Sequence, residues 1–219
     1  TLKLAASLDG KIAAESGDAR WISGEESRRA VHGLRNRVDA VVIGSGTLKA
    51  DDPQLTCRID GGRNPWRVVL DSRLSISLSA QILHQKDPDK TIIVSAAGAP
   101  AAKTRAIEAL GAHVWRFPRG KGDVPWFPVL RKLAAMDVVN VLIEGGAKVA
   151  ASAMREKVVD KIIFFYAPKI IGGDGVAMIG DLGIRRVRQA LELEDLRFAK
   201  SGKDLSVTGY LSRAKLPRR

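Results

Sequence analysis

The sequence is poor in cysteine and histidine and has no long apolar run, which argues against disulfides, metal sites and membrane spans, respectively. Cys57 has no second cysteine, so an internal disulfide is excluded and a reducing compartment is favoured. The three histidines are scattered and show no metal-ligand spacing. No run reaches the roughly 18 apolar residues of a membrane span, and the first residues have no signal-peptide pattern. We therefore expect a cytoplasmic protein without metal or membrane.

Aromatic residues are also few, at 5%, although the formal net charge is +12. A strongly basic balance can indicate nucleic-acid binding. Here the basic residues are spread along the chain, and the dense cluster is confined to residues 213–219. No stretch alternates aromatic and basic residues as a stacking platform for single strands would. A general surface excess, with a few cations kept for small phosphorylated ligands, explains this pattern better than a nucleic-acid groove.

Short apolar runs alternate with helical patterns along the chain, as in α/β proteins with a mostly parallel central sheet flanked by helices. The strands are expected at residues 2–8, 39–43, 67–70, 91–94, 113–117, 139–143 and 161–166. The longer helices are expected at residues 23–37, 101–110, 128–136 and 147–154. Two extended runs around Ser201-Gly202 predict a C-terminal antiparallel hairpin. Without a composition break, one domain over 1–213 and a basic tail at 214–219 are expected.

The most informative stretch joins the apolar run at 139–143 to the helix formers at 147–154 through Glu144-Gly145-Gly146. The run is short enough for a strand buried on both faces. The glycines let a ligand approach the backbone, and the following helix N-terminus attracts anions such as phosphate. Glu144 ends a buried strand, where open α/β sheets bind ligands. A tight connection with an ordinary surface glutamate is the alternative, because a lone glycine pair is weak evidence.

Polar groups recur at the ends of the predicted strands, at Lys3, Asp51-Asp52-Pro53, Asp71-Ser72 and Glu144. Each has a structural explanation, such as an edge lysine, a turn that ends a helix or a hydrogen-bonded cap. Their order and spacing, however, resemble the reductase domain of bacterial RibD, the bifunctional deaminase-reductase of riboflavin biosynthesis. The resemblance covers nearly the whole chain and rests on the segments LAASLDGKIA (4–13), WIS (21–23), DDP (51–53), DS (71–72), IEGG (143–146) and APKIIGG (167–173).

The resemblance implies a dihydrofolate-reductase-like fold and a reduction that depends on NADPH. It implies 5-amino-6-(5-phosphoribosylamino)uracil as the substrate, whose ribosyl group becomes ribityl when hydride passes from nicotinamide C4 to sugar C1′. The cofactor carries the hard chemical step, and the protein supplies orientation and electrostatics. The zinc-binding His/Cys signature of the RibD deaminase is absent. Because the chain starts inside a predicted strand, we expect a deaminase domain to have been removed; a stand-alone reductase is the alternative.

The resemblance also implies roles for single residues. Lys3 and Asp51 are expected near the reacting carbon as the catalytic pair. Residues expected to contact the substrate are Ala19, Arg35, Leu55, Arg58 and Glu144. Residues expected to contact NADPH are Ala5, Trp21, Thr47, Asp51, Ser72, Gly146, Ala147, Lys148, Val149, Ala150, Ala151 and Ser152. The chemistry of these residues agrees with the roles. The guanidinium groups of Arg35 and Arg58 suit a phosphate, Glu144 can accept hydrogen bonds from pyrimidine N–H groups, and Trp21 offers a flat apolar surface to the cofactor. Some family members carry serine at the Ala19 position, where only a backbone contact survives the change.

Two further expectations concern the cofactor and the assembly. Ser72 and Arg73 place a neutral donor beside a cation, which favours the 2′-phosphate of NADPH over NADH. Asp71 is the competing acidic signal, but on a strand it should face away from Ser72. The apolar strand at 161–166 and the terminal hairpin predict a homodimer through the C-terminal region. Two other functions stay open: a sister reductase of the undeaminated diaminopyrimidine, and a basic nucleotide- or RNA-binding module.

Overall fold

The computed structural model describes residues 1–118 and 125–212, so the expected basic tail at 214–219 lies outside the described residues. The chain divides into two compact units. Unit 1 comprises Thr1–Val31 and Glu144–Arg219, and unit 2 comprises His32–Ile143. Helix α1 (Glu25–Arg37) begins in unit 1 and ends in unit 2. The expected extent of a single domain over 1–213 stays a prediction.

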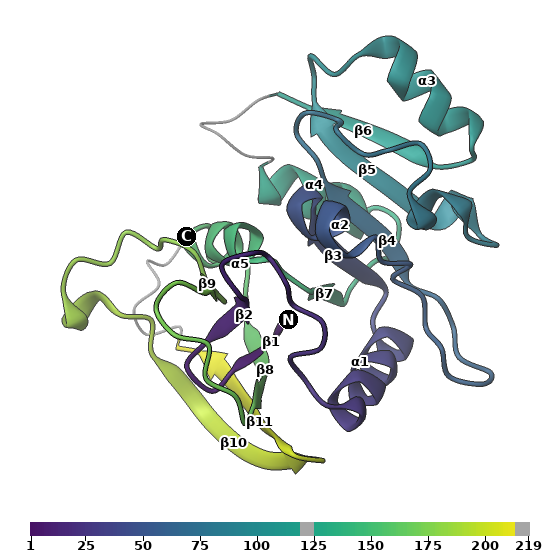
Figure 1. Cartoon of the computed structure of the whole chain (residues 1–219). Helices are drawn as coiled ribbons and strands as arrows, with labels where there is room; N and C mark the ends of the chain where they lie inside the picture. Colours follow the sequence, from purple (N-terminus) through teal and green to yellow (C-terminus); the bar gives the residue numbers. More distant parts are fainter. Residues whose placement is uncertain (119–124, 213–219) are drawn as a thin grey trace. The chain divides into compact units, whose positions relative to one another are not determined.

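Unit 2 carries five parallel strands in the order β7-β3-β4-β5-β6 (Figure 1). Their bounds are β3 (Ala40–Gly44), β4 (Trp66–Leu70), β5 (Thr91–Ala96), β6 (His113–Phe117) and β7 (Val141–Ile143). The α-helices within this unit are α2 (Ser45–Asp51), α3 (Ala101–Ala109) and α4 (Trp126–Ala134), with short 3₁₀ turns η1 (Gln81–His84) and η2 (Pro88–Lys90). Residues 40–44 are all buried, as the near-continuous apolar run of a parallel strand requires.

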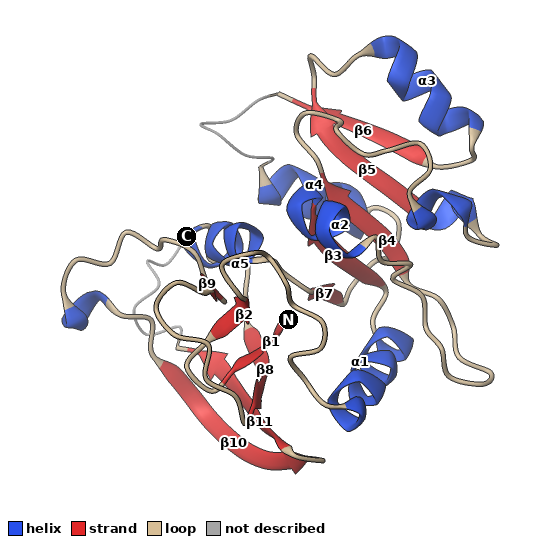
Figure 2. Ribbon diagram, viewed as in Figure 1, coloured by secondary structure: helices blue, strands red, loops and turns tan. Residues whose placement is uncertain are grey.

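Unit 1 carries four strands of mixed direction in the order β10-β11-β8-β1 (Figure 2). Their bounds are β1 (Leu2–Ser7), β8 (Lys161–Ala167), β10 (Leu193–Ser201) and β11 (Asp204–Leu211). β1 and β8 are parallel, whereas β11 is antiparallel to both β8 and β10. The unit also contains α5 (Ala147–Arg155), the 3₁₀ turn η3 (Val187–Gln189) and a small ribbon of β2 (Lys11–Ala13) and β9 (Val176–Ala177). The expected α/β class, mostly parallel pairing and C-terminal hairpin are confirmed.

Two details of the expected elements are wrong. Strand β7 covers only Val141–Ile143, and Val139, expected to be buried, is 83% exposed. The cause is Asp39, whose carboxylate accepts hydrogen bonds from the backbone N–H groups of Val139 and Asn140 at 3.1 and 2.8 Å. These amides are therefore satisfied before the strand begins. Helix α4 starts at Trp126 rather than residue 128, because the buried Trp126 belongs to its apolar face.

A buried ion pair lies inside unit 2, at the N-terminal end of β4. Arg67 is fully buried and donates from Nε to Thr91 Oγ1 at 3.0 Å and from Nη1 to Asp87 Oδ1 at 2.8 Å; Nη2 donates to the Asp87 carbonyl. Burial acts to raise the pKa of the Asp87 carboxyl, but hydrogen bonds from Asn64 and Arg67, with the Arg67 charge, lower it overall. A buried charge needs such complete pairing. Within the described residues, no helix is long and apolar enough to cross a membrane.

Candidate active site

The turn after β4 separates the roles of Asp71 and Ser72. Asp71 is 1% exposed, and its carboxylate accepts hydrogen bonds from the backbone N–H of Ile76 at 2.8 Å and from Ser75 Oγ at 3.0 Å. Its carbonyl accepts the N–H of Leu74 at 2.9 Å. Asp71 therefore builds this turn from within and is not presented to a ligand. Ser72 is half-buried, and its backbone carbonyl accepts the N–H of Ala96.

Helix α2 presents Thr47 and Asp51 on one face, four residues apart. Asp51 is exposed at the end of the helix. Asp52 then takes the left-handed conformation with φ of 42°, and its N–H bonds the carbonyl of Leu48. The carboxylate of Asp52 accepts the N–H of Gln81 at 2.9 Å. Of the two neighbouring aspartates, Asp52 anchors the chain and Asp51 is the one presented outward.

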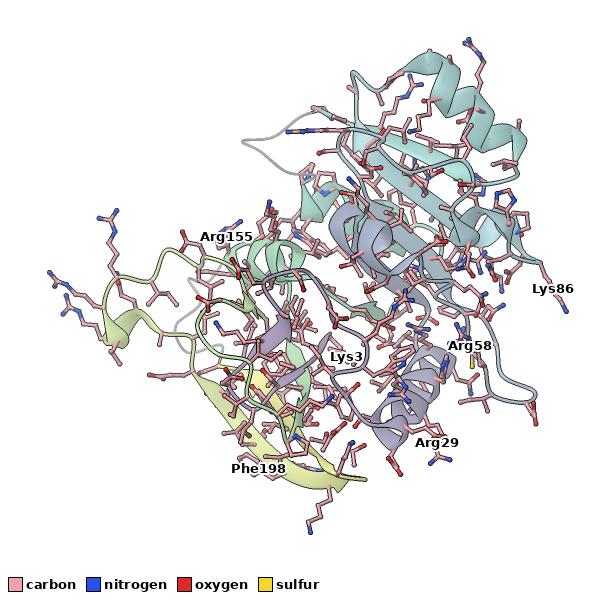
Figure 3. The ribbon with its side chains drawn as sticks, in the orientation of Figure 1. Lys3, Arg29, Arg58, Lys86, Arg155 and Phe198 are labelled. Atoms are coloured by element: carbon pink, nitrogen blue, oxygen red, sulfur yellow. The ribbon has the colours of Figure 1, made fainter. Side chains whose placement is uncertain are left out.

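A basic cluster forms in unit 2 where α1 meets the segment at 55–58. The Arg35 guanidinium donates to the carbonyl of Thr56 at 3.2 Å, and the backbone N–H of Arg58 donates to His32 Nδ1 at 3.3 Å. These bonds join α1 to residues 55–58 at the positions of the two arginines expected at the substrate phosphate, and Arg58, labelled in Figure 3, contributes its backbone to them. Leu55 has φ of 54° and is 2% exposed, with its side chain in the core of unit 2. Its side chain is therefore not available to a ligand.

The passage from β7 into α5 requires glycine on steric grounds. Gly145 has φ of +91°, and a Cβ atom there would lie 2.8 Å from Leu4 Cδ2. Gly146 is the N-cap of α5 and has no side chain that could compete with a bound anion for the first amides. In the range expected to contact NADPH, residues 150–152 are buried, whereas 147–149 are half-buried or exposed. The first turn of α5 is therefore the accessible part.

Strand β1 places Lys3 and Ala5 on one face, because side chains two residues apart on a strand point the same way. Both are half-buried, while Leu2, Leu4 and Ala6 are buried. The Lys3 ammonium, labelled in Figure 3, lies 5.7 Å from the centre of the Phe165 ring. This distance suits a cation held over the ring of a neighbouring strand.

The loop before α1 displays Trp21, which is 64% exposed. The Arg28 guanidinium lies 4.7 Å from the centre of the indole ring and donates to the carbonyl of Ser23 at 2.7 Å. Ala19 is half-buried, and its carbonyl accepts the N–H of Ile22 at 3.1 Å. The resemblance gave Arg28 no role, although the sequence places it on one face of the expected helix with His32 and Arg35.

The expected site residues are divided between the two units. Unit 1 holds Lys3, Ala5, Ala19, Trp21, Glu144 and the residues 146–152, and unit 2 holds Arg35, Thr47, Asp51, Leu55, Arg58 and Ser72. The expected pairing of Lys3 with Asp51 therefore stays a prediction. Among the described residues, no group of three or more His, Cys, Asp or Glu side chains could hold a metal ion.

Residues 1–207 match the family model of the RibD C-terminal domain. The chain belongs to this family. It is 37% identical over 215 residues to riboflavin biosynthesis protein PYRR, chloroplastic, of Arabidopsis thaliana. This match covers 96% of this chain and 34% of the relative. The structure of Acinetobacter baumannii RibD (form 1) superposes with a TM-score of 0.84 at 29% identity, covering 96% of this chain and 57% of that one.

A second solved relative of this RibD C-terminal domain carries the activity in its name. It is the diaminohydroxyphosphoribosylaminopyrimidine deaminase/5-amino-6-(5-phosphoribosylamino)uracil reductase of Thermotoga maritima. The TM-score is 0.73 at 29% identity, and the match covers 96% of this chain and 56% of that one. The chain thus spans about a third to somewhat over half of the length of these relatives.

One buried carboxylate of this RibD C-terminal domain also escaped the sequence reasoning. Asp204, in the hairpin, is 1% exposed, and its Oδ2 accepts the N–H of Gly24 at 2.7 Å and the Ser27 hydroxyl at 2.6 Å. It therefore ties the start of α1 to the hairpin. Asp204 lies 180 residues from Gly24, so no local pattern of the sequence could reveal this contact.

Proposed function

We propose that this chain is the reductase part of a riboflavin-biosynthesis protein and uses NADPH to reduce the ribosyl group of 5-amino-6-(5-phosphoribosylamino)uracil to ribityl. The family match and the name of the Thermotoga maritima relative support this reaction. The observation that carries the proposal is the passage from Glu144 through Gly145 into α5. There Gly145 is sterically required, and the first turn of the helix is accessible.

The residues present fit a dinucleotide phosphate. The α5 N-terminus suits an anion, and Lys148, exposed in its first turn, adds positive charge. Ser72 and the exposed Arg73 suit a 2′-phosphate, while the Asp71 carboxylate is engaged by its own turn and would not hold the ribose of NADH. Trp21 would supply a flat wall. We therefore propose NADPH as the cofactor in preference to NADH.

For the substrate, we assign the phosphate to Arg35 and Arg58, whose guanidinium groups suit a phosphate and whose chain segments are joined by hydrogen bonds in unit 2. Glu144 would accept hydrogen bonds from pyrimidine N–H groups. The half-buried Ala19 and the buried Leu55 would contribute only backbone contacts.

NADPH, when bound, supplies the hydride. The protein's own task is at the atom that receives the electron pair when hydride adds to C1′ of the opened imine or aldehyde-like sugar. We propose that the Lys3 ammonium stands there and stabilises the developing negative charge, and that Asp51 orients it. Electrostatic groups of this type act mainly on the transition state, so they control the turnover rate.

We also propose a homodimer that uses β8 and the hairpin. Phe198 of β10 pairs with Val207 of β11, which pairs with Phe164 of β8, so the three side chains lie on one face of the sheet. Phe198, labelled in Figure 3, is 65% exposed, and Leu205, on the same face, is 40% exposed. Such an apolar face is typical of an interface. We also propose a reducing, cytoplasmic location, because Cys57 has no second cysteine with which to form an internal disulfide.

The test is NADPH oxidation with 5-amino-6-(5-phosphoribosylamino)uracil, run beside its undeaminated diaminopyrimidine analogue. We expect turnover with the uracil compound at a clearly higher kcat/KM. Faster turnover of the analogue would identify the sister reductase instead. If NADPH were oxidised with neither compound and the protein bound RNA in a salt-sensitive way, the function would be that of a nucleic-acid-binding module and not of an enzyme.

A further inference from the structure

Three segments of unit 1 meet at Asp9, in the turn that follows β1. The Asp9 carboxylate accepts hydrogen bonds from Ser7 Oγ at 2.6 Å, from the N–H of Gly172 at 2.7 Å and from the N–H of Ile171 at 3.2 Å. The N–H of Leu8 donates to the carbonyl of Lys169 at 2.8 Å. We call this group, formed by Ser7, Asp9, Lys169, Ile171 and Gly172, the Asp9 junction.

The junction is polar and joins segments of different burial: Ser7 is fully buried, whereas Ile171 and Gly172 are half-buried. Asp9 is exposed, yet its carboxylate reaches residues more than 160 positions along the chain. The Ser7 hydrogen bond and then the Gly172 amide lower the pKa of Asp9 to about 2. Because this pKa is depressed, the stabilisation is present above the unfolded value near 3.9 and is lost only as pH falls through about 2. At neutral pH the carboxylate is ionised and holds the 169–172 segment.

The junction continues to Trp21 through Lys169. Lys169 Nζ donates a hydrogen bond to the backbone carbonyl of Trp21 at 2.5 Å, and Arg28 lies over the indole ring at 4.7 Å. Trp21 is therefore held at its backbone by one cation and at its ring by another. An exposed tryptophan with two such partners has a defined orientation that an unsupported surface loop would not give it.

We propose that Asp9 and Lys169 are positioning residues, which fix the indole of Trp21 in the orientation that receives the cofactor. Asp9 fixes the 169–172 segment, and Lys169 transmits that position to the Trp21 backbone. This inference rests on the proposed function, because it gives Trp21 a cofactor to contact. It extends that function to two residues with no proposed contact to cofactor or substrate.

The first test measures the junction without any activity. In Asp9→Asn, amide hydrogen exchange at Ile171 and Gly172 should rise at least several-fold, because a neutral amide oxygen replaces a charged acceptor. In Lys169→Met, acrylamide quenching of the Trp21 fluorescence should change, and Lys169→Arg should restore most of the wild-type value. Because the chain has four tryptophans, the Trp21 signal is taken as the difference between each protein and the same protein carrying Trp21→Phe. The matched control is Lys132→Met, which removes a lysine 4.4 Å from the Trp115 ring in unit 2. If amide exchange in Asp9→Asn and Trp21 quenching in Lys169→Met were both unchanged, the proposal that the junction fixes Trp21 would be wrong.

The second test is a double-mutant cycle on NADPH affinity. Lys169→Met should raise the Kd for NADPH by about 3- to 10-fold, the range expected for the loss of one ordinary hydrogen bond, because the effect reaches the cofactor only through Trp21. It should leave the KM for the pyrimidine substrate unchanged. In a Trp21→Ala background, where no indole remains to be positioned, Lys169→Met should have no further effect. Additive effects would mean that Lys169 touches the cofactor itself and would overturn its positioning role.

The outcomes separate the two proposals. A wild type that binds no NADPH contradicts the proposed function and the inference together. A wild type that binds and oxidises NADPH, but is indifferent to both Asp9→Asn and Lys169→Met, contradicts the inference alone. If Asp9→Asn lost NADPH affinity and thermal stability to the same extent, with no change in Trp21 quenching, the junction would only stabilise the fold. This result would also contradict the proposed positioning role.

Discussion

Replacing Gly145 by alanine perturbs the candidate nucleotide site at a single point whose cost has two separable causes. The backbone there has φ of +91°, which L side chains rarely adopt. The new methyl group would also lie 2.8 Å from Leu4 Cδ2, inside van der Waals contact. Gly183 is a matched control in the same unit, because its φ is +71° and nothing lies within 4 Å of a built Cβ.

The expected magnitudes follow from these two causes. A non-glycine residue in a sparsely populated backbone region costs about 1–3 kcal/mol. Forcing a methyl group into a packed site adds about 1–3 kcal/mol. Gly145→Ala should therefore lower the free energy of unfolding by about 2–6 kcal/mol, a large part of the roughly 5–15 kcal/mol typical of a domain. Gly183→Ala should show the backbone cost alone.

The assay is urea denaturation of both variants, repeated for Gly145→Ala in a Leu4→Ala background. Removing the Leu4 side chain relieves the overlap, so the cost of Gly145→Ala should fall by about 1–3 kcal/mol in that background. NADPH affinity should also drop in Gly145→Ala, because the shifted backbone displaces the first turn of α5. A Gly145→Ala variant as stable as Gly183→Ala, with normal NADPH affinity, would refute this reasoning.

Three further predictions concern catalysis, cofactor choice and assembly. In steady-state kinetics, Lys3→Ala and Asp51→Asn should lower kcat by about 10²-fold, whereas Arg35→Ala should mainly raise the substrate KM. A normal kcat with a raised KM in Lys3→Ala and Asp51→Asn would show that these two residues bind the substrate and do not act in catalysis. Arg73→Ala should narrow the NADPH preference over NADH by about tenfold or less in calorimetry, and equal binding by the wild type would rule the preference out. Phe198→Asp should convert a dimer to a monomer in light scattering, and a monomeric wild type at micromolar concentration would count against the proposed interface.

The sequence predicted those parts of the fold whose signal is local. Short apolar runs identified the strands, and good helix formers after Gly146 identified α5. Val139 was predicted wrongly, because its exposure depends on Asp39, 100 residues away in the chain. Arg67 stands in an apolar run that reads correctly as a strand. Its burial could not be predicted, since its partner Asp87 lies in a loop 20 residues later.

The candidate site divides in the same way. The glycine turn before α5 carries a local physical reason to bind anions, so the sequence alone indicated it. The individual roles came from the resemblance, and the structure limits them: the Leu55 side chain lies in the core, and residues 150–152 are buried. Asp9 and Lys169 stand in the sequence only within two segments that carry the resemblance and had no role assigned, because their partners are distant in the sequence and become visible only in the folded chain.

The most direct test of the central claim follows the hydride itself. The enzyme would be given NADPH deuterated at both C4 positions together with 5-amino-6-(5-phosphoribosylamino)uracil, and the product would be examined by mass spectrometry and NMR. The account predicts one deuterium per product molecule, located at C1′ of the new ribityl chain. A product without deuterium, or with deuterium at any other carbon, would contradict it.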